Sequence, residues 1–200
     1  MNEAVDILMP ELEKEQEGLS QKYKSKKILL ATVDGDVHDI GKNILSLVLK
    51  SNNYNVADLG VMVPNEEIIR KIEEERPDIV GLSGLITPSL DYMVEFVKML
   101  EKKKITIPVL IGGATTSLVH TALKMAPHYS GVVVQVSDAS RSFAVVNNLL
   151  GEDSEKYIEN IKAEQARLRD TYYKKRKERR KVTFSNTQRK RYMYDYKKQR

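Results

Sequence analysis

The sequence contains no cysteine. It can therefore form no disulfide and no thiolate metal site, and it offers no cysteine nucleophile. It also lacks any apolar run long enough to span a membrane, and its short acidic start at residues 1–8 does not have the charge pattern of a signal peptide. We therefore expect a cytoplasmic protein with no membrane segment.

The composition permits one globular domain, because 41% of the 200 residues are hydrophobic. The net charge of +5 is unevenly distributed. Residues 1–150 carry 16 basic and 20 acidic side chains, whereas residues 151–200 carry 17 and 8. The sequence thus predicts a mildly acidic body followed by a strongly basic tail.

From residue 27 onward, short apolar runs alternate with helical patterns. Strands are expected at 27–33, 54–59, 78–82, 107–111 and 131–135. Helices are expected at 40–52, 65–76, 89–104, 115–126 and 138–150. This alternation indicates an α/β fold whose parallel sheet is covered on both faces. We expect a flavodoxin-like (Rossmann-like) five-stranded parallel sheet with strand order 2-1-3-4-5.

Two further segments flank this pattern. Residues 1–24 have the apolar stripe of an amphipathic helix, formed by Val5, Leu8, Met9 and Leu12. Residues 151–182 predict a long, polar, basic helix, and residues 183–200 lack periodicity.

The chemistry-bearing side chains follow the first strand. Asp36 and His38 are two residues apart, so they point the same way in an extended loop. A carboxylate behind an imidazole fixes its tautomer and raises its basicity, which suits a metal ligand. In a parallel sheet such a loop lines the ligand crevice at the carboxyl edge.

Two other loops should meet the first one at that edge. They are Ser83–Ser89, which combines small hydroxyl and apolar side chains, and Gly112–Thr116, which begins with a glycine pair. Together they predict a deep slot with few charges. Such a slot suits a large, mostly neutral ligand better than a nucleotide polyphosphate.

Two sites common in related folds are excluded. A phosphate-binding loop needs four residues between its glycines and a Ser or Thr after the lysine, whereas Gly35 and Gly41 enclose five residues and Asn43 follows Lys42. A phosphoacceptor signalling domain needs an aspartate after the third strand and a lysine after the fifth. The sequence has Ser83 and Val136-Ser137 there.

The three loops together resemble the cobalamin-binding domain family, whose fingerprint is Asp-x-His-x-x-Gly, then Ser-x-Leu, then Gly-Gly. Here these motifs stand as Asp36–Gly41, Ser83–Leu85 and Gly112-Gly113. Longer segments are similar to the corresponding domain of cobalamin-dependent methionine synthases, namely 35–43, 58–64, 84–90, 111–117 and 138–141. The resemblance covers roughly residues 27–150.

The resemblance implies a role for each matching position. His38 would ligate the cobalt of cobalamin (methylcobalamin) from its lower face, displacing the benzimidazole of the cofactor. Asp36 would hydrogen-bond the other ring nitrogen of His38, and Ser89 would hydrogen-bond Asp36. Room for the displaced nucleotide tail would come from Gly41, Gly112 and Gly113. The slot would be lined by Ser83, Leu85 and Thr87, and the corrin would touch Gly35, Val37, Asp39 and Ala139.

The resemblance also implies a division of the chain and a function. Residues 1–26 would be a remnant of a helical cap and its linker, 27–150 the cobalamin-binding domain, and 151–200 a basic linker helix and tail. The domain would carry the methyl group from methyltetrahydrofolate to homocysteine, as a methionine synthase module or split subunit whose homocysteine, folate and activation modules lie elsewhere. The alternative is a corrinoid methyl carrier of a methanol or methylamine system.

Simpler interpretations remain beside these roles. Asp39 and Ser89 could each be the N-cap of the helix that follows, and the glycine pair could be only a tight turn. In the tail, Tyr172-Tyr173 beside Lys174–Lys177 could bind nucleic acid through stacking and phosphate contacts. We favour a solvated linker helix.

Overall fold

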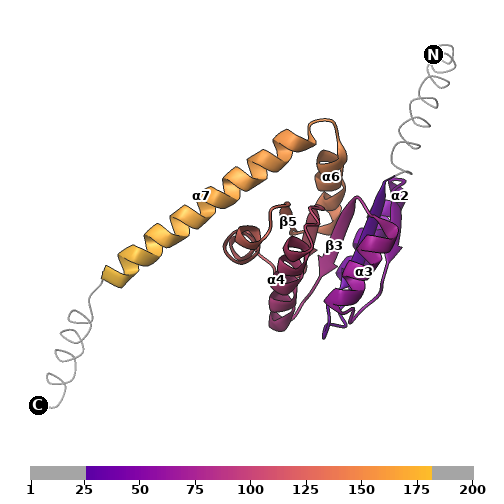
Figure 1. Ribbon diagram of the computed structural model, residues 1–200, viewed down its shortest axis with the longest axis horizontal. Coiled ribbons are helices and arrows are strands. Elements are labelled where there is room, and N and C mark those ends of the chain that lie inside the picture. Colours follow the sequence, from indigo (N-terminus) through magenta and orange to yellow (C-terminus); the bar gives the residue numbers. More distant parts are fainter. Residues whose placement is uncertain (1–25, 182–200) are drawn as a thin grey trace, which may run out of the picture.

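The computed structural model describes residues 26–181 and contains one parallel sheet (Figure 1). Its strands are β1 (Lys27–Thr32), β2 (Asn55–Asp58), β3 (Ile79–Ser83), β4 (Val109–Gly112) and β5 (Val133–Val136). The strand order is β2-β1-β3-β4-β5, and all neighbours pair in parallel. The predicted flavodoxin-like sheet is therefore confirmed.

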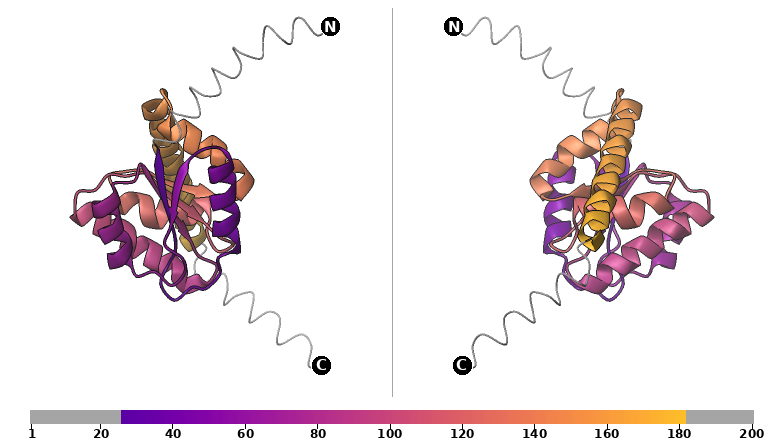
Figure 2. Two further views of the ribbon diagram at one scale, coloured as in Figure 1. Left: turned by 90° about the vertical axis from the view of Figure 1, so that its right-hand side faces the viewer. Right: turned by 90° about the vertical axis from the view of Figure 1, so that its left-hand side faces the viewer.

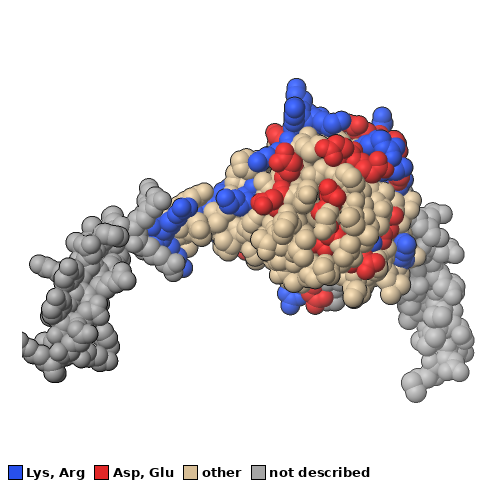
Figure 3. Space-filling view, turned by 90° about the horizontal axis from the view of Figure 1, so that it is seen from below, with Lys and Arg blue, Asp and Glu red and all other residues tan. Residues whose placement is uncertain are grey.

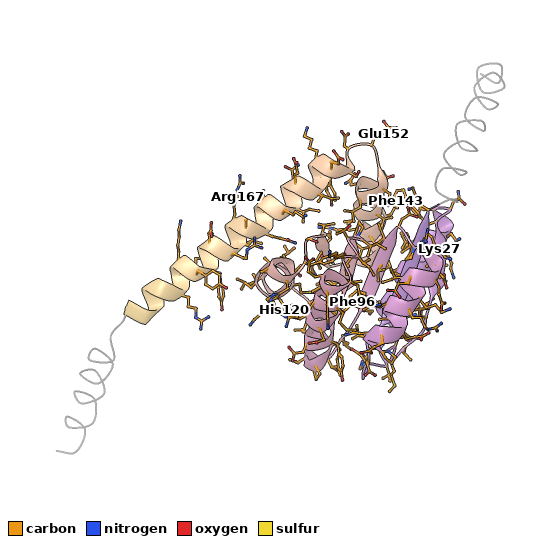
Figure 4. The ribbon with its side chains drawn as sticks, in the orientation of Figure 1. Lys27, Phe96, His120, Phe143, Glu152 and Arg167 are labelled. Atoms are coloured by element: carbon orange, nitrogen blue, oxygen red, sulfur yellow. The ribbon has the colours of Figure 1, made fainter. Side chains whose placement is uncertain are left out.

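Successive side chains point to opposite sides of a sheet, and β1, β3, β4 and β5 bury side chains on both sides, whereas the edge strand β2 is partly exposed. One face contributes Leu29, Ala31, Val80, Leu82, Val109 and Ile111 to a core cluster. The other face contributes Ile28, Leu30, Ile79, Leu110, Val134 and Val136 to a second cluster. Phe96 packs in the first cluster and Phe143 against the second (Figure 4).

Helices cover both faces of the sheet (Figure 2). The helices α2 (Ile40–Ser51) and α6 (Ala139–Leu150) pack together on one face. The helices α3 (Asn65–Glu75) and α4 (Thr87–Lys102) pack together on the other face. Each of these helices follows a parallel strand, so its first turn lies at the carboxyl edge of the sheet. The loops after β1 and β3 lead there into α2 and α4.

The fourth crossover differs from the single helix predicted at 115–126. It consists of α5 (Leu118–His120), a π-helical turn at Thr121–Met125 and a 3₁₀ turn at Ala126–His128. Ser117 caps the start by accepting the amide of His120 at 3.2 Å. The α-helical geometry ends at His120, before Pro127, whose missing amide prevents a regular α-helix from resuming there.

The last helix, α7 (Ser154–Lys181), confirms the long helix expected at 151–182. Its N-terminal part, up to Arg169, packs on the body, where the buried Gln165 donates to the carbonyl of Val133 at 2.7 Å and Arg169 donates to the carbonyl of Ala122 at 3.1 Å. The helix α7 thus lies against the fourth crossover, α6 and the start of the edge strand β5, and its C-terminal part extends away from the body (Figure 1). The division of the chain at residue 150 stays a prediction.

The expected helix at 1–24 and the tail at 183–200 lie outside the described residues. Within residues 26–181, no helix combines the length and the apolar character that crossing a membrane would need.

Candidate functional site

The loops after β1, β3 and β4 converge at the carboxyl edge of the sheet, as expected. The amide of Gly84 donates to the carbonyl of Gly112 at 3.1 Å, which joins the second loop to the third. Seen from this edge, the body presents a broad uncharged surface with scattered carboxylates, and Lys and Arg gather mainly at its margin and along α7 (Figure 3).

Asp36 is the buried polar centre of this edge, with 1% of its surface exposed. One carboxylate oxygen, Oδ1, accepts a hydrogen bond from the backbone amide of His38 at 3.0 Å and another from Nδ1 of the His38 ring at 2.7 Å. The other, Oδ2, accepts the Ser89 hydroxyl at 2.6 Å and the amides of Leu85 and Ile86 at 2.6 and 3.3 Å. Five donors on one carboxylate hold the first and second loops together.

These contacts determine the charge of Asp36. Burial alone would raise its pKa, but the hydrogen bonds from Ser89, the amides of His38 and Leu85, and the His38 ring together hold the pKa well below its usual value of 3.8. The carboxylate is therefore ionised at neutral pH. An ionised acceptor requires a proton on Nδ1 of His38, which leaves the lone pair of Nε2 available.

His38 itself lies at the surface of the first loop. Its side chain is half exposed, whereas its carboxylate partner is buried. An imidazole that is oriented from behind and open in front can ligate a metal ion through Nε2. The structure thus brings together Asp36, His38 and Ser89 in the arrangement that the sequence predicted.

The low pKa of Asp36 has a consequence for stability. A carboxylate whose pKa is lower in the folded than in the unfolded state stabilises the fold. This contribution is complete above the unfolded-state pKa of about 3.8 and is lost as the pH falls through the lower folded-state pKa. We expect Asp36→Asn to lower the free energy of unfolding by about 2 kcal/mol at neutral pH. The difference from the wild type should shrink as the pH falls from about 4 toward about 2.

Urea unfolding of the cofactor-free chain at several pH values measures this difference. Asp34→Asn is the matched control, because Asp34 lies in the same loop and bonds only the adjacent amide of Gly35. The control should follow the wild type at every pH. A gap for Asp36→Asn that does not change with pH would show that the ionised carboxylate is not what stabilises the loop.

A cavity of about 300 Å³ opens beside this loop, between the sheet and the first turns of α2. Its lining is largely apolar and includes Leu30, Gly41, Lys42, Leu45, Gly81, Ser83, Leu110, Gly112, Gly113 and Val136. Of the predicted cofactor-binding residues, Gly41, Ser83, Gly112 and Gly113 lie in the wall of this cavity.

Other predicted residues lie elsewhere. Leu85 and Thr87 are exposed and do not line this cavity, although the backbone of Leu85 holds Asp36. Gly35 and Val37 are exposed in the first loop, and Ala139 begins α6 at the same edge. Contacts from these residues to a cofactor stay predictions.

The structure decides between the simpler interpretations of Asp39 and Ser89. Asp39 stands at the N-cap position of α2, but its side chain caps no amide and instead accepts from Asn43 at 2.9 Å. Helix α4 begins at Thr87, two residues before the prediction, because Pro88 suits a first helical turn. Ser89 is therefore inside the helix, and the N-cap interpretation of Ser89 is wrong.

The glycine pair serves the chain itself as well as the cavity. At Gly113 the backbone has φ +121°, and a Cβ atom there would overlap the backbone of Gly84. The two loops can pack this closely only because Gly113 lacks a side chain. Gly112 has no such overlap and lines the cavity.

Sequence reasoning missed several residues at the site. The amides of Leu85 and Ile86 carry no sequence signal, because any residue except proline has one. Leu30, Leu110 and Val136 resemble ordinary core residues in the sequence. In the sequence, Lys42 stands out only as part of an incomplete phosphate-loop pattern. In the structure its buried side chain lines the cavity.

Comparison with known families supports a cofactor site here. The profile of the B12 binding domain matches residues 26–144, which include all five strands and the three loops. A cobalamin-binding protein from Desulfitobacterium hafniense is 34% identical, with a TM-score of 0.57, and the match covers 63% of this chain and 60% of that chain.

Two methanogen proteins have similar structures. The methanol:cobalamin methyltransferase complex MtaBC from Methanosarcina barkeri is 30% identical, with a TM-score of 0.57 over 62% of this chain and 46% of that chain. The monomethylamine corrinoid protein of the same organism is 22% identical, with a TM-score of 0.54 over 67% and 63%, and supports the fold alone. The chain thus spans less than two thirds of each of these proteins.

Proposed function

Because the chain belongs to the B12-binding domain family, with cobalamin as its cofactor, we propose that His38 is the lower ligand of the cobalt and that the cavity takes the displaced nucleotide tail. The observation that carries this proposal is the Asp36–His38–Ser89 chain beside a largely apolar cavity. The residues fit the cofactor, because Nε2 of His38 is free to ligate and the cavity suits an uncharged heterocycle.

Asp36, His38 and Ser89 would each have a different role in cofactor binding. When bound, cobalamin supplies a cobalt ion that can carry a methyl group between a donor and an acceptor. Asp36 fixes the proton on Nδ1 of His38 and so aims Nε2 at the lower face. Asp36 would also stabilise a positive charge on the imidazole that it faces, and Ser89 holds the carboxylate in place.

For the reaction, we favour methyl transfer from methyltetrahydrofolate to homocysteine, with the substrate and activation modules outside this chain. The support is the similarity of segments 35–43, 58–64 and 84–90 to methionine synthases. The second candidate is a methyl carrier for methanol or methylamine. The likeness to the Methanosarcina barkeri methanol:cobalamin complex, at 30% identity, favours that alternative.

Loading with methylcobalamin tests the binding proposal. We expect the purified chain to retain about one equivalent of methylcobalamin after gel filtration. The visible spectrum should be that of a form in which imidazole has replaced benzimidazole. Failure to retain the cofactor, or a benzimidazole-ligated spectrum in the bound state, would contradict the proposal.

The loaded chain can then separate the two reactions. The methyl group should pass to homocysteine when a homocysteine-binding methionine synthase module is added. A methanol or methylamine system should neither load nor unload it. Exchange with the methanol or methylamine components alone would favour the second candidate.

A further inference from the structure

Lys42 is a buried cation in the wall of the cavity. Its side chain is 3% exposed, and its ammonium group donates to Oδ2 of Asp58 and, at 2.9 Å, to Oδ1 of Asn43. Burying an ammonium group is costly even when it is paired, and an apolar residue of similar size often stabilises a fold as well. A buried ammonium group whose partner, Asp58, is still partly exposed therefore calls for a role other than stability.

The ion pair joins two elements that flank the site. Lys42 belongs to the first turn of α2, directly after the loop that bears His38, and Asp58 is the last residue of β2. The second carboxylate oxygen of Asp58 accepts the amide of Gly60 at 2.9 Å. Asp58 thus fixes both the lysine and the turn that follows β2, here called the 59–63 turn.

The 59–63 turn supports the loop that bears His38 from the side opposite Ser89. Within it, the amide of Met62 donates to the carbonyl of Asp36 at 3.1 Å. The carbonyl of Gly60 accepts the amide of Thr32 at 2.9 Å, and the amide of Val63 donates to the carbonyl of Thr32 at 3.0 Å. The backbone of Asp36 is therefore held by this turn, while its carboxylate is held by α4.

The conformation of the turn is one that needs support. Met62 has φ +53°, in the left-handed region that residues with a side chain rarely adopt. Such a conformation persists only where surrounding contacts impose it. The contacts at hand are the backbone bonds of the turn to Thr32 and Asp36, together with the Asp58 carboxylate that Lys42 holds.

We propose that Lys42, acting through Asp58, is a positioning residue that fixes the 59–63 turn against the loop bearing Asp36 and His38. Its consequence for the cofactor rests on the proposed function of His38. Lys42 itself does not touch the cobalt. It sets where the imidazole stands relative to the cavity that the lysine side chain also lines.

Amide hydrogen exchange in the cofactor-free chain tests the proposal without any cofactor. We expect Lys42→Met to speed exchange at the Met62 amide by about tenfold or more, while the Leu85 amide changes little. Lys42→Arg should restore slow exchange, because arginine keeps the cation. Lys50→Met is the control, since Lys50 is an exposed basic residue in the last turn of α2.

The same exchange measurements distinguish a local positioning role of Lys42 from a general stabilisation of the fold. If Lys42→Met lowers the melting temperature but accelerates the Met62 and Leu85 amides equally, the lysine stabilises the fold in general and the proposal is wrong. Unchanged exchange at Met62 would overturn it as well. If Lys42→Met does not fold, Asp58→Asn removes the same link and should show the same local pattern at Met62.

Spectra of the loaded chain test the consequence for His38. Saturated with methylcobalamin, Lys42→Met should show the imidazole-ligated form in less than about half of the molecules. Lys50→Met should match the wild type. A Lys42→Met spectrum identical to the wild type would contradict the positioning role at His38. A wild type that never shows imidazole ligation would instead refute the proposed function and leave the exchange test standing.

Discussion

Replacing His38 by alanine is expected to abolish imidazole ligation and to leave part of the binding. Loss of an outer partner of a metal ligand typically costs 10–100-fold in affinity, and loss of the ligand itself should cost at least about 100-fold. Binding should persist because the nucleotide tail keeps its apolar contacts in the cavity of about 300 Å³. Titration with methylcobalamin, followed in the visible spectrum, measures both quantities.

The chain offers a matched control for this substitution. His128 is an exposed histidine in the 3₁₀ turn at Ala126–His128, outside the three loops. The His128→Ala variant should bind and absorb like the wild type. If His38→Ala keeps the wild-type spectrum, another group ligates the cobalt and the assignment of the lower ligand is wrong.

Replacing Gly41 by leucine is expected to block the cofactor without harming the fold. Gly41 lines the cavity, and a Cβ atom built on it would meet no other atom within 4 Å. It is also the second residue of α2, where leucine favours the helix over glycine by up to about 1 kcal/mol. The melting temperature should therefore stay level or rise, while cobalamin affinity falls by at least about 100-fold.

A tailless ligand separates blocking from distortion. Cobinamide lacks the nucleotide, so its binding should be the same in the wild type and in Gly41→Leu. Gly113→Ala is the contrasting variant, because its Cβ atom would overlap the backbone of Gly84 at φ +121°. It should lower the melting temperature and weaken both ligands. Equal losses of cobalamin and cobinamide in Gly41→Leu would show that the cavity does not hold the tail.

The sheet was predictable because its strands are continuous apolar runs between helical patterns. Where the boundaries moved, single residues explain the shift. Strand β4 begins at Val109 instead of 107, after Pro108, which has no amide to donate. The fourth crossover lost its regular helix at Thr121, where a π-helical turn begins, and apolar periodicity does not distinguish such a turn from an α-helix.

The site was predictable where side chains carry the chemistry. Asp36 and His38 lie two residues apart, and Ser89 joins them through a matching loop motif. The parts that were not predictable depend on backbone geometry or on distant residues. The amides that hold Asp36 and the pairing of Lys42 with Asp58, 16 residues away, exist only once the loops are folded together.

Electron paramagnetic resonance of the cobalt(II) form of the bound cofactor tests the central claim most directly. The superhyperfine splitting of its lines reports the nitrogen atom that ligates the cobalt from below. The protein is prepared with nitrogen-15 in its histidines, and the cofactor keeps natural nitrogen-14. If His38 is the ligand, labelling the protein should turn each triplet into a doublet, and His38→Ala should remove this change. Triplets that persist in the labelled protein would show that the cofactor's own benzimidazole remains on the cobalt, which contradicts the account.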